Sequence, residues 1–165
     1  LVDRLVRLAP CPTLVVKGGI DETAEWTPRR ILVPTNGSGA ARQAAELAFR
    51  LAGENDVVVI LNVVRTTQEP HELIRSSEDY RFRTGQSIIQ ELAEVGSANG
   101  VRTLPMLRTG AEPDEVILEV AASTGAGLIV MGTDIRPASD RLFLGPRVER
   151  ILDEASVPVL VFNAV

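Results

Sequence analysis

Cysteine and histidine are almost absent from this chain: Cys11 and His71 are the only residues of their types. A single cysteine cannot close an internal disulfide, which fits a reducing compartment. A lone histidine without a second histidine or a cysteine offers no zinc site, so we expect no metal centre. Cys11 lies between Pro10 and Pro12 beside an apolar run. We therefore predict a buried structural thiol rather than a nucleophile.

Excess positive charge and long apolar runs are also missing. The net charge of −5 excludes an electrostatic footprint for nucleic acid or an anionic membrane. No apolar run reaches the roughly 18 residues of a transmembrane helix, so no segment is predicted to span a bilayer. The chain shows no signal peptide and starts at Leu1 without an initiating Met, which indicates a piece of a longer polypeptide. Its 165 residues, 45% hydrophobic and 24% charged, suit one soluble domain with a small addition.

An internal repeat is present at an offset of 146 residues. The offset aligns six identical pairs along an amphipathic helix, a turn and an apolar strand. These pairs are Val2/Val148, Arg4/Arg150, Ala9/Ala155, Pro12/Pro158, Leu14/Leu160 and Val15/Val161. We predict that residues 1–17 are the last helix and strand of an upstream copy. Residues 18–29 are then a linker, and residues 30–165 form a complete domain.

The complete domain is expected to alternate strands and helices. Short apolar or β-branched runs predict the strands, and amphipathic spacing between them predicts the helices. The predicted strands span 30–34, 57–64, 101–107, 128–131 and 157–162. This alternation predicts a three-layer α/β sandwich, with a five-stranded parallel sheet and helices on both faces. Right-handed crossovers favour the strand order 3-2-1-4-5.

A candidate ligand site follows from this strand order. Ligands of such sheets bind at the carboxyl ends of the strands, where the winding reverses. That point lies between the first and fourth strands, at residues 35–38 and 132–134. Ser38 is also expected to be the N-cap of the helix that follows the first strand.

Three segments in this order together resemble the universal stress protein family: residues 31–38, 128–132 and 157–161. The resemblance implies an adenine nucleotide alpha-hydrolase-like fold. Residues 140–149 and the pair Thr35-Asn36 are similar, more narrowly, to the tandem copies found behind bacterial cation/proton antiporters. That likeness implies the cytosolic tail of an inner-membrane sodium/hydrogen exchanger, with roles in ion transport and the stress response.

Nucleotide-binding members of this family carry Gly-x2-Gly-x9-Gly-Ser/Thr after the fourth strand, where glycines let backbone N–H groups close on phosphates. Here the matching positions hold Gly132, Ile135, Gly145 and Pro146. Ile135 puts a side chain where close approach is needed, and Pro146 removes an N–H group and a hydroxyl. Asn36 stands where ATP-binding relatives usually hold an aspartate. The resemblance therefore implies an altered pocket, with ATP, AMP or a cyclic dinucleotide as the ligands to consider.

Three arginines near this motif could replace the lost phosphate contacts: Arg136, Arg141 and Arg147. The alternative is that they pair with neighbouring acidic residues on a solvated face. The full set of nucleotide-binding candidates is Pro34, Thr35, Asn36, Ser38, Met131, Gly132, Thr133, Ile135, Arg136, Arg141, Gly145, Pro146 and Arg147.

Three functions remain open. The first is a cytosolic regulatory module that passes nucleotide occupancy to an attached transporter. The second is an interaction module in which the exposed edge of the fifth strand pairs with another strand. This pairing would make a homodimer, or a pseudo-dimer with residues 12–17, and its strand residues are Val157, Val159, Leu160, Val161 and Phe162. The third is a nucleotide hydrolase built on Asp134 and Asp140. Neither has a partner at catalytic spacing, so we expect no enzyme and assign no catalytic residue.

Overall fold

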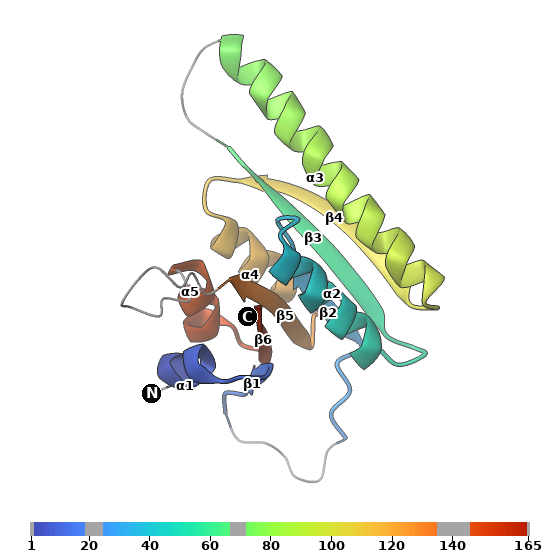
Figure 1. The fold of residues 1–165 in the computed structure, drawn as a ribbon, viewed down its shortest axis with the longest axis vertical. Coiled ribbons are helices and arrows are strands. Elements are labelled where there is room, and N and C mark those ends of the chain that lie inside the picture. Colours follow the sequence, from blue (N-terminus) through green and yellow to red (C-terminus); the bar gives the residue numbers. More distant parts are fainter. Residues whose placement is uncertain (1, 19–24, 67–71, 135–145, 165) are drawn as a thin grey trace.

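The computed structural model describes residues 2–18, 25–66, 72–134 and 146–164. Figure 1 shows a twisted sheet between two layers of helices. In chain order the elements are α1 (Val2–Leu8), β1 (Thr13–Val15), β2 (Arg30–Pro34), α2 (Gly39–Leu51), β3 (Val57–Arg65), α3 (Glu72–Ala98), β4 (Arg102–Gly110), α4 (Pro113–Thr124), β5 (Leu128–Asp134), α5 (Pro146–Glu154) and β6 (Val159–Ala164).

The described strands form one sheet in the order β1-β6-β5-β2-β3-β4. Neighbours from β6 to β4 are parallel, whereas β1 is antiparallel to β6. The α/β class and the relative order of the five strands within residues 30–165 are confirmed. The prediction of a five-stranded, wholly parallel sheet is wrong, because Thr13–Val15 adds a sixth strand. The outer edge of β6 carries backbone groups that need partners, and β1 supplies them.

Side chains of the central strands alternate between two apolar layers. Leu32, Val59 and Ile129 enter the layer beneath α4 and α5, whereas Ile31 and Val58 enter the layer beneath α2 and α3. All five are fully buried. Burial on both faces explains why these strands read as continuous apolar runs rather than as alternating patterns.

The last strand begins two residues later than predicted. Pro158 has no N–H group, so regular ladder pairing starts at Val159. The Pro158 carbonyl still accepts a hydrogen bond from Ile129 N at 3.0 Å. Val157 precedes the strand and packs against the core beneath α4 and α5.

Helix α2 lies close to the sheet because its buried face is made of alanines, with Phe49 as the only larger buried residue. Ser38 is its N-cap, as predicted, and its Oγ accepts a hydrogen bond from Ala41 N at 3.2 Å. Gly37, with φ +81°, turns the chain from β2 into the helix.

Helix α3 has 27 residues, whereas the sequence predicts a helix here only from the apolar spacing of residues 88, 89, 92 and 93. Its buried residues Ile89, Leu92 and Ala93 lie in the C-terminal half. Figure 1 shows the N-terminal turns projecting past the end of the sheet, and Tyr80 there is 71% exposed. Turns without a sheet beneath them need no apolar face, so periodicity revealed only the packed half. None of the described helices, α3 included, combines the length and apolarity needed to cross a bilayer.

The N-terminal helix and strand dock on β6 and α5. Val6 is fully buried in the layer beneath α4 and α5. Its carbonyl oxygen accepts a hydrogen bond from Asn163 Nδ2 at 2.6 Å. The prediction of a buried Cys11 is wrong, since the thiol is exposed. The reason is that Cys11 lies between the exposed Pro10 and Pro12, in the turn from α1 to β1, rather than in the strand.

Candidate functional site

A cavity of about 190 Å³ opens at the carboxyl ends of β2 and β5. These strands are adjacent and mark the point where the winding of the sheet reverses. Strands β2, β3 and β5, helix α4 and the ends of α2 and α5 all contribute to the lining. The lining residues are Pro34, Thr35, Asn36, Ala41, Leu61, Val63, Pro113, Ile117, Met131, Gly132, Arg147 and Val148.

The loop after β2 forms one wall and is tied to β3. Thr35 N donates to the carbonyl oxygen of Leu61 at 2.8 Å. Asn62 Nδ2 donates in return to the carbonyl oxygen of Thr35, also at 2.8 Å. Thr35 and Asn62 are both buried, so these two bonds hold the wall in place without help from solvent.

The start of α2 has few donors left for an anion. Gly37 N donates to Thr35 Oγ1 at 3.2 Å, and Ser38 N donates to Asn36 Oδ1 at 3.0 Å. Ser38 Oγ in turn accepts from Ala41 N. The exposed Asn36 also brings an amide nitrogen that donates, where aspartate offers only acceptors. The local bonds therefore leave few backbone donors for a phosphate at this wall, whereas the Asn36 amide can donate to a neutral acceptor atom of a ligand.

The start of α5 forms the facing wall and is more open to an anion. Pro146 is the first helical residue and has no N–H group. Arg147 and Val148 line the cavity, and backbone N–H groups in a first helical turn have no partner within the helix. The helix dipole and the exposed Arg147 guanidinium both favour negative charge here.

Gly132 sits where β5 passes the first turn of α2. A Cβ atom at this position would overlap the carbonyl group of Ala40 and the nitrogen of Ala41. Packing between strand and helix therefore requires glycine here, whether or not a phosphate binds. The first glycine of the family motif thus has a structural reason of its own.

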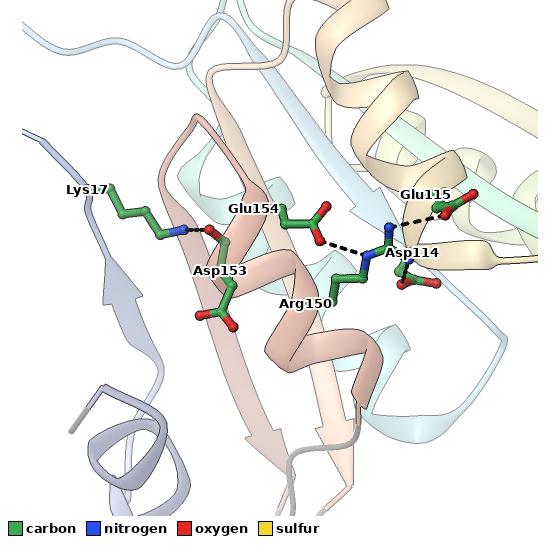
Figure 2. Close-up of polar contacts among 6 residues, drawn as sticks. All are labelled: Lys17, Asp114, Glu115, Arg150, Asp153 and Glu154. Atoms are coloured by element: carbon green, nitrogen blue, oxygen red, sulfur yellow. Dashed lines mark hydrogen bonds and ion pairs between the residues drawn. The ribbon is translucent and has the colours of Figure 1, made fainter.

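Arg150 joins α5 to the first turn of α4, beside the cavity. Figure 2 shows its guanidinium among three carboxylates. Its Nη1 donates to Asp114 Oδ2 at 2.9 Å, Nη2 to Glu115 Oε1 at 3.1 Å, and Nε to Glu154 Oε1 at 2.9 Å. These hydrogen bonds, Glu154's first, raise the pKa of Arg150 above its ordinary value. The cluster positions the start of α5 relative to α4.

The structure brings a part of the predicted site together. Ser38 caps α2 instead of lining the cavity, and Thr133 is buried further along β5, opposite Asn163 of β6. Pro146 begins α5. The predicted candidates that line the cavity are Pro34, Thr35, Asn36, Met131, Gly132 and Arg147. The predicted site residues that lie outside the described residues are Ile135, Arg136, Arg141 and Gly145, together with the candidate acid Asp140.

Sequence reasoning missed the apolar floor of the cavity. Leu61 and Val63 come from the carboxyl end of β3, and Ile117 comes from α4. The predicted strand order could have indicated Leu61 and Val63, because it places the second predicted strand (β3) beside the first (β2), at whose end the site was expected. No comparable signal existed for Ile117, since its place depends on how the crossover lays α4 over the strand ends.

The strand predicted as a dimer edge has neighbours on both sides within the chain. Ladder pairing with β5 runs from Val159 to Ala164, and pairing with β1 involves Val159, Leu160 and Val161. Phe162 pairs with Gly132 only. Association with a second polypeptide through this strand stays a prediction.

Comparison with known proteins identifies the family. The model of the universal stress protein family matches residues 27–163. A universal stress protein of Methanocaldococcus jannaschii is 30% identical over 141 residues, which is 81% of each chain. The crystal structure of a universal stress protein family member from Burkholderia pseudomallei superposes with a TM-score of 0.70 at 28% identity, over 83% of this chain and 97% of that one. The chain belongs to the universal stress protein family.

Two more distant structures share the fold. A family protein from Arabidopsis thaliana, solved with AMP bound, gives a TM-score of 0.63 at 17% identity, over 82% of this chain and 92% of that one. A universal stress protein from Archaeoglobus fulgidus gives 0.67 at 20% identity, over 98% of this chain but 52% of that one. At these identities the likeness establishes the fold alone.

Proposed function

We propose that this chain is a non-catalytic regulatory domain. It binds an adenine nucleotide or a related phosphate-bearing anion in the cavity at the ends of β2 and β5. The domain lies in the cytosol, and occupancy of the cavity regulates an attached cation/proton antiporter. The antiporter part of the proposal rests on the likeness of residues 140–149 and Thr35-Asn36 to the tandem copies behind such transporters.

The class of ligand is inferred from one observation: the cavity combines an apolar floor with a cationic side chain at its opening. Leu61, Val63 and Ile117 offer an apolar surface, whereas Arg147 stands at the start of α5. A nucleotide has the same two-sided chemistry, with a flat base at one end and phosphate at the other. AMP bound to the Arabidopsis family member supports this choice.

The size of the cavity favours a small ligand. Drug-sized ligands occupy pockets of roughly 300–1,000 Å³, and this cavity measures about 190 Å³. It therefore accommodates one end of a mononucleotide rather than the whole molecule. We expect a monophosphate or cyclic monophosphate to bind at least as well as ATP.

Calorimetric titration with AMP, cyclic AMP, ADP, ATP and cyclic dinucleotides tests the proposal. For any ligand that binds, Arg147→Gln should weaken affinity about 10- to 100-fold, the equivalent of one charge-assisted hydrogen bond. Arg50→Gln is the matched control, because Arg50 is an exposed arginine in the last turn of α2, away from the cavity. No heat with any ligand, or equal losses in the two variants, would reject nucleotide binding here.

A second candidate is a ligand-free interaction module. Two observations favour it. Packing against α2 is enough to require glycine at position 132, without a phosphate. The N–H groups of Gly37 and Ser38 before α2 bond neighbouring side chains instead of a ligand. Ile135→Gly with Pro146→Ser restores the family motif and separates the two candidates. A gain in nucleotide affinity supports a weakened nucleotide site, whereas no binding before or after the change supports the interaction module.

Hydrolysis is the least supported function. It would require Asp134 or Asp140 to act as a base or a metal ligand near the phosphates. We expect ATP incubated with the protein to release phosphate no faster than ATP alone. Release that Asp134→Ala abolishes would overturn the non-catalytic proposal.

A further inference from the structure

A second cavity, of about 210 Å³, lies between the carboxyl end of β3 and helix α3. Figure 1 shows α3 running along the sheet and past the end of β3. The lining comes from the last residues of β3 and from residues of α3 between 80 and 88. Asn36 and Val63 border both this cavity and the candidate nucleotide site. The two cavities are therefore neighbours, but most of their linings differ.

Asn62 brings an unused hydrogen-bond acceptor to the second cavity. It interrupts the apolar run of β3 and is only 7% exposed. Its Nδ2 donates to the carbonyl oxygen of Thr35 at 2.8 Å, whereas no group within the described parts of the chain donates to its Oδ1. A largely buried amide oxygen without a donor is unfavourable. A ligand that donates a hydrogen bond to Oδ1 would remove this cost.

Gly85 of α3 keeps this acceptor uncovered. A Cβ atom at position 85 would lie 2.4 Å from Oδ1 of Asn62 and 3.0 Å from Cδ1 of Leu107. Glycine within a helix is unfavourable relative to alanine, and position 85 is near the middle of the 27 residues of α3. The helix thus carries a weak helix former at the one place where a methyl group would cover the Asn62 oxygen.

Two arginines border the second cavity: Arg65 at the end of β3 and Arg81 in α3. Arg65 Nε donates to the carbonyl oxygen of Ala111 at 3.2 Å, and Arg81 Nη1 lies 3.5 Å from the carbonyl oxygen of Arg65. Both side chains are exposed, and neither forms an ion pair with any residue that the structure describes. Their guanidinium groups therefore have donors left for an anion.

We propose that the second cavity binds a small hydroxylated organic phosphate. A phosphate monoester carries about −1.5 to −2 charges at pH 7, which matches two guanidinium groups better than the single charge of a carboxylate. A hydroxyl group of the same ligand donates to Asn62 Oδ1. Pockets for drug-sized ligands measure roughly 300–1,000 Å³, so a cavity of about 210 Å³ favours a sugar phosphate over a nucleotide. The proposal does not depend on whether the first cavity binds a nucleotide.

The test is a titration of the nitrogen-15-labelled chain with ribose 5-phosphate and with glycerol 3-phosphate, followed by amide chemical shifts. We expect the largest changes at residues 62–65 and 80–88, which surround the second cavity. Methyl phosphate keeps the phosphate without a free alcohol, and ribose keeps the hydroxyl groups without the phosphate. Each should bind at least ~10-fold more weakly than ribose 5-phosphate, because each lacks one of the two contacts.

Two arginines of α3 make a matched pair of variants. Arg81→Gln should weaken the binding of ribose 5-phosphate about 10-fold, the equivalent of one charge-assisted hydrogen bond. Arg83→Gln is the control, because Arg83 is an exposed arginine of the same helix that does not line the cavity. Gly85→Ala should abolish binding by covering Asn62 Oδ1. Since this change also crowds Leu107, its fold is checked by circular dichroism, and the arginine pair decides the test if the variant unfolds.

Four outcomes would overturn the proposal. One is that neither phosphate changes the shifts of residues 62–65 and 80–88. Another is that the changes centre on Gly132 and the start of α5, because the phosphate then occupies the first cavity. Equal losses in Arg81→Gln and Arg83→Gln would mean that the overall charge of α3 attracts the anion. Methyl phosphate binding as tightly as ribose 5-phosphate would leave Asn62 without a role.

Discussion

At the scale of single residues, small side chains shape the candidate site. Gly132 lets β5 pass the backbone of α2, and the alanines of α2 keep that helix close to the sheet. The cavity lies at the end of this tight contact, and Ala41 and Gly132 both line it. A ligand therefore meets backbone and short side chains on this side and the longer Arg147 on the other.

Gly132→Ala should lower the free energy of unfolding by about 1–3 kcal/mol, the usual cost of overpacking. The added methyl group meets the backbone of Ala40 and Ala41, which cannot rotate away as a side chain can. Urea denaturation monitored by circular dichroism measures the change. Gly39→Ala is the control, because a Cβ atom there has no neighbour within 4 Å, and it should be neutral or slightly stabilising. Equal stability of the two variants would contradict the packing role of Gly132.

Single residues also show how far the sequence could reach. Asn36 and Gly132 were placed at the site from strand order alone, and both line the cavity. The packing role of Gly132 could not be predicted, since it depends on the distance between β5 and α2. Cys11 was misassigned because flanking prolines indicate a turn as readily as the edge of a buried strand.

At the scale of elements, ionic contacts fasten helices to one another on each face of the sheet. Arg150 joins α5 to α4 through three carboxylates. On the opposite face, Arg42 of α2 contacts Glu91 of α3 with both terminal nitrogens, at 2.5 and 3.0 Å. The Arg150 contacts lie beside the cavity. Their loss should therefore loosen the start of α5, which lines it.

Arg150→Lys should loosen α5 while keeping the positive charge. A lysine cannot bond three carboxylates in the planar arrangement that the guanidinium uses, and the buried Asp114 loses a close partner. We expect faster amide exchange in α5 and a lower urea midpoint. Arg102→Lys is the control, since Arg102 is an exposed arginine that bonds the carbonyl oxygen of Asn55 instead. Unchanged exchange in α5 would mean that packing alone holds the helix.

Glu91 should titrate below its ordinary range. The hydrogen bond from Arg42, followed by the attraction of its charge, lowers the pKa of this carboxyl. A carboxyl with a lowered pKa in the folded state stabilises the fold above its ordinary pKa, and this contribution is lost as the pH falls through the lowered value. NMR titration of the side-chain carboxyl measures the shift, which Arg42→Gln should remove. Because both groups are exposed, we expect little effect on overall stability.

Elements were predicted best where both faces are packed. The central strands were located closely because burial on two sides leaves continuous apolar runs. The first half of α3 was missed because it extends beyond the sheet and needs no apolar stripe. The edge that the sixth strand joins was predicted, because residues 12–17 repeat the last strand and were one of its two candidate partners. The repeat did not reveal whether this pairing lies within one chain or between two.

At the scale of the whole molecule, the seam is the contact surface between α1–β1 and α5–β6. The 146-residue repeat makes its backbone pairing twofold symmetric, but its charges do not follow this symmetry. Arg7 Nη2 contacts Glu149 Oε1 at 2.5 Å across it. The repeat counterpart of Arg7 is Asp153. Two complete copies that paired through β6 would therefore bring Asp153 of each to Glu149 of the other. The seam thus favours the pairing of unlike copies over that of identical ones.

Residues 30–165, expressed without α1 and β1, should form at most a weak dimer. Asp153→Arg in this shortened chain replaces two repulsive contacts with two attractive ones, and should tighten dimerisation about 10-fold. Sedimentation equilibrium at low and high salt measures the change, which should shrink as salt screens the charges. Glu119→Arg, a charge reversal of the same size at an exposed residue of α4, is the control. Equal effects of the two substitutions would exclude β6 pairing in this geometry.

The pairing of β1 with β6 also imposes an order in time. The ribosome makes residues 13–15 first, but their partners at 159–161 come 146 residues later. At ~5–20 residues per second, β1 waits about 7–30 s for its neighbour. Throughout that interval its edge is open on the growing chain. Chaperones that bind extended apolar segments can therefore bind β1 during this period, which ends only when β6 has been made.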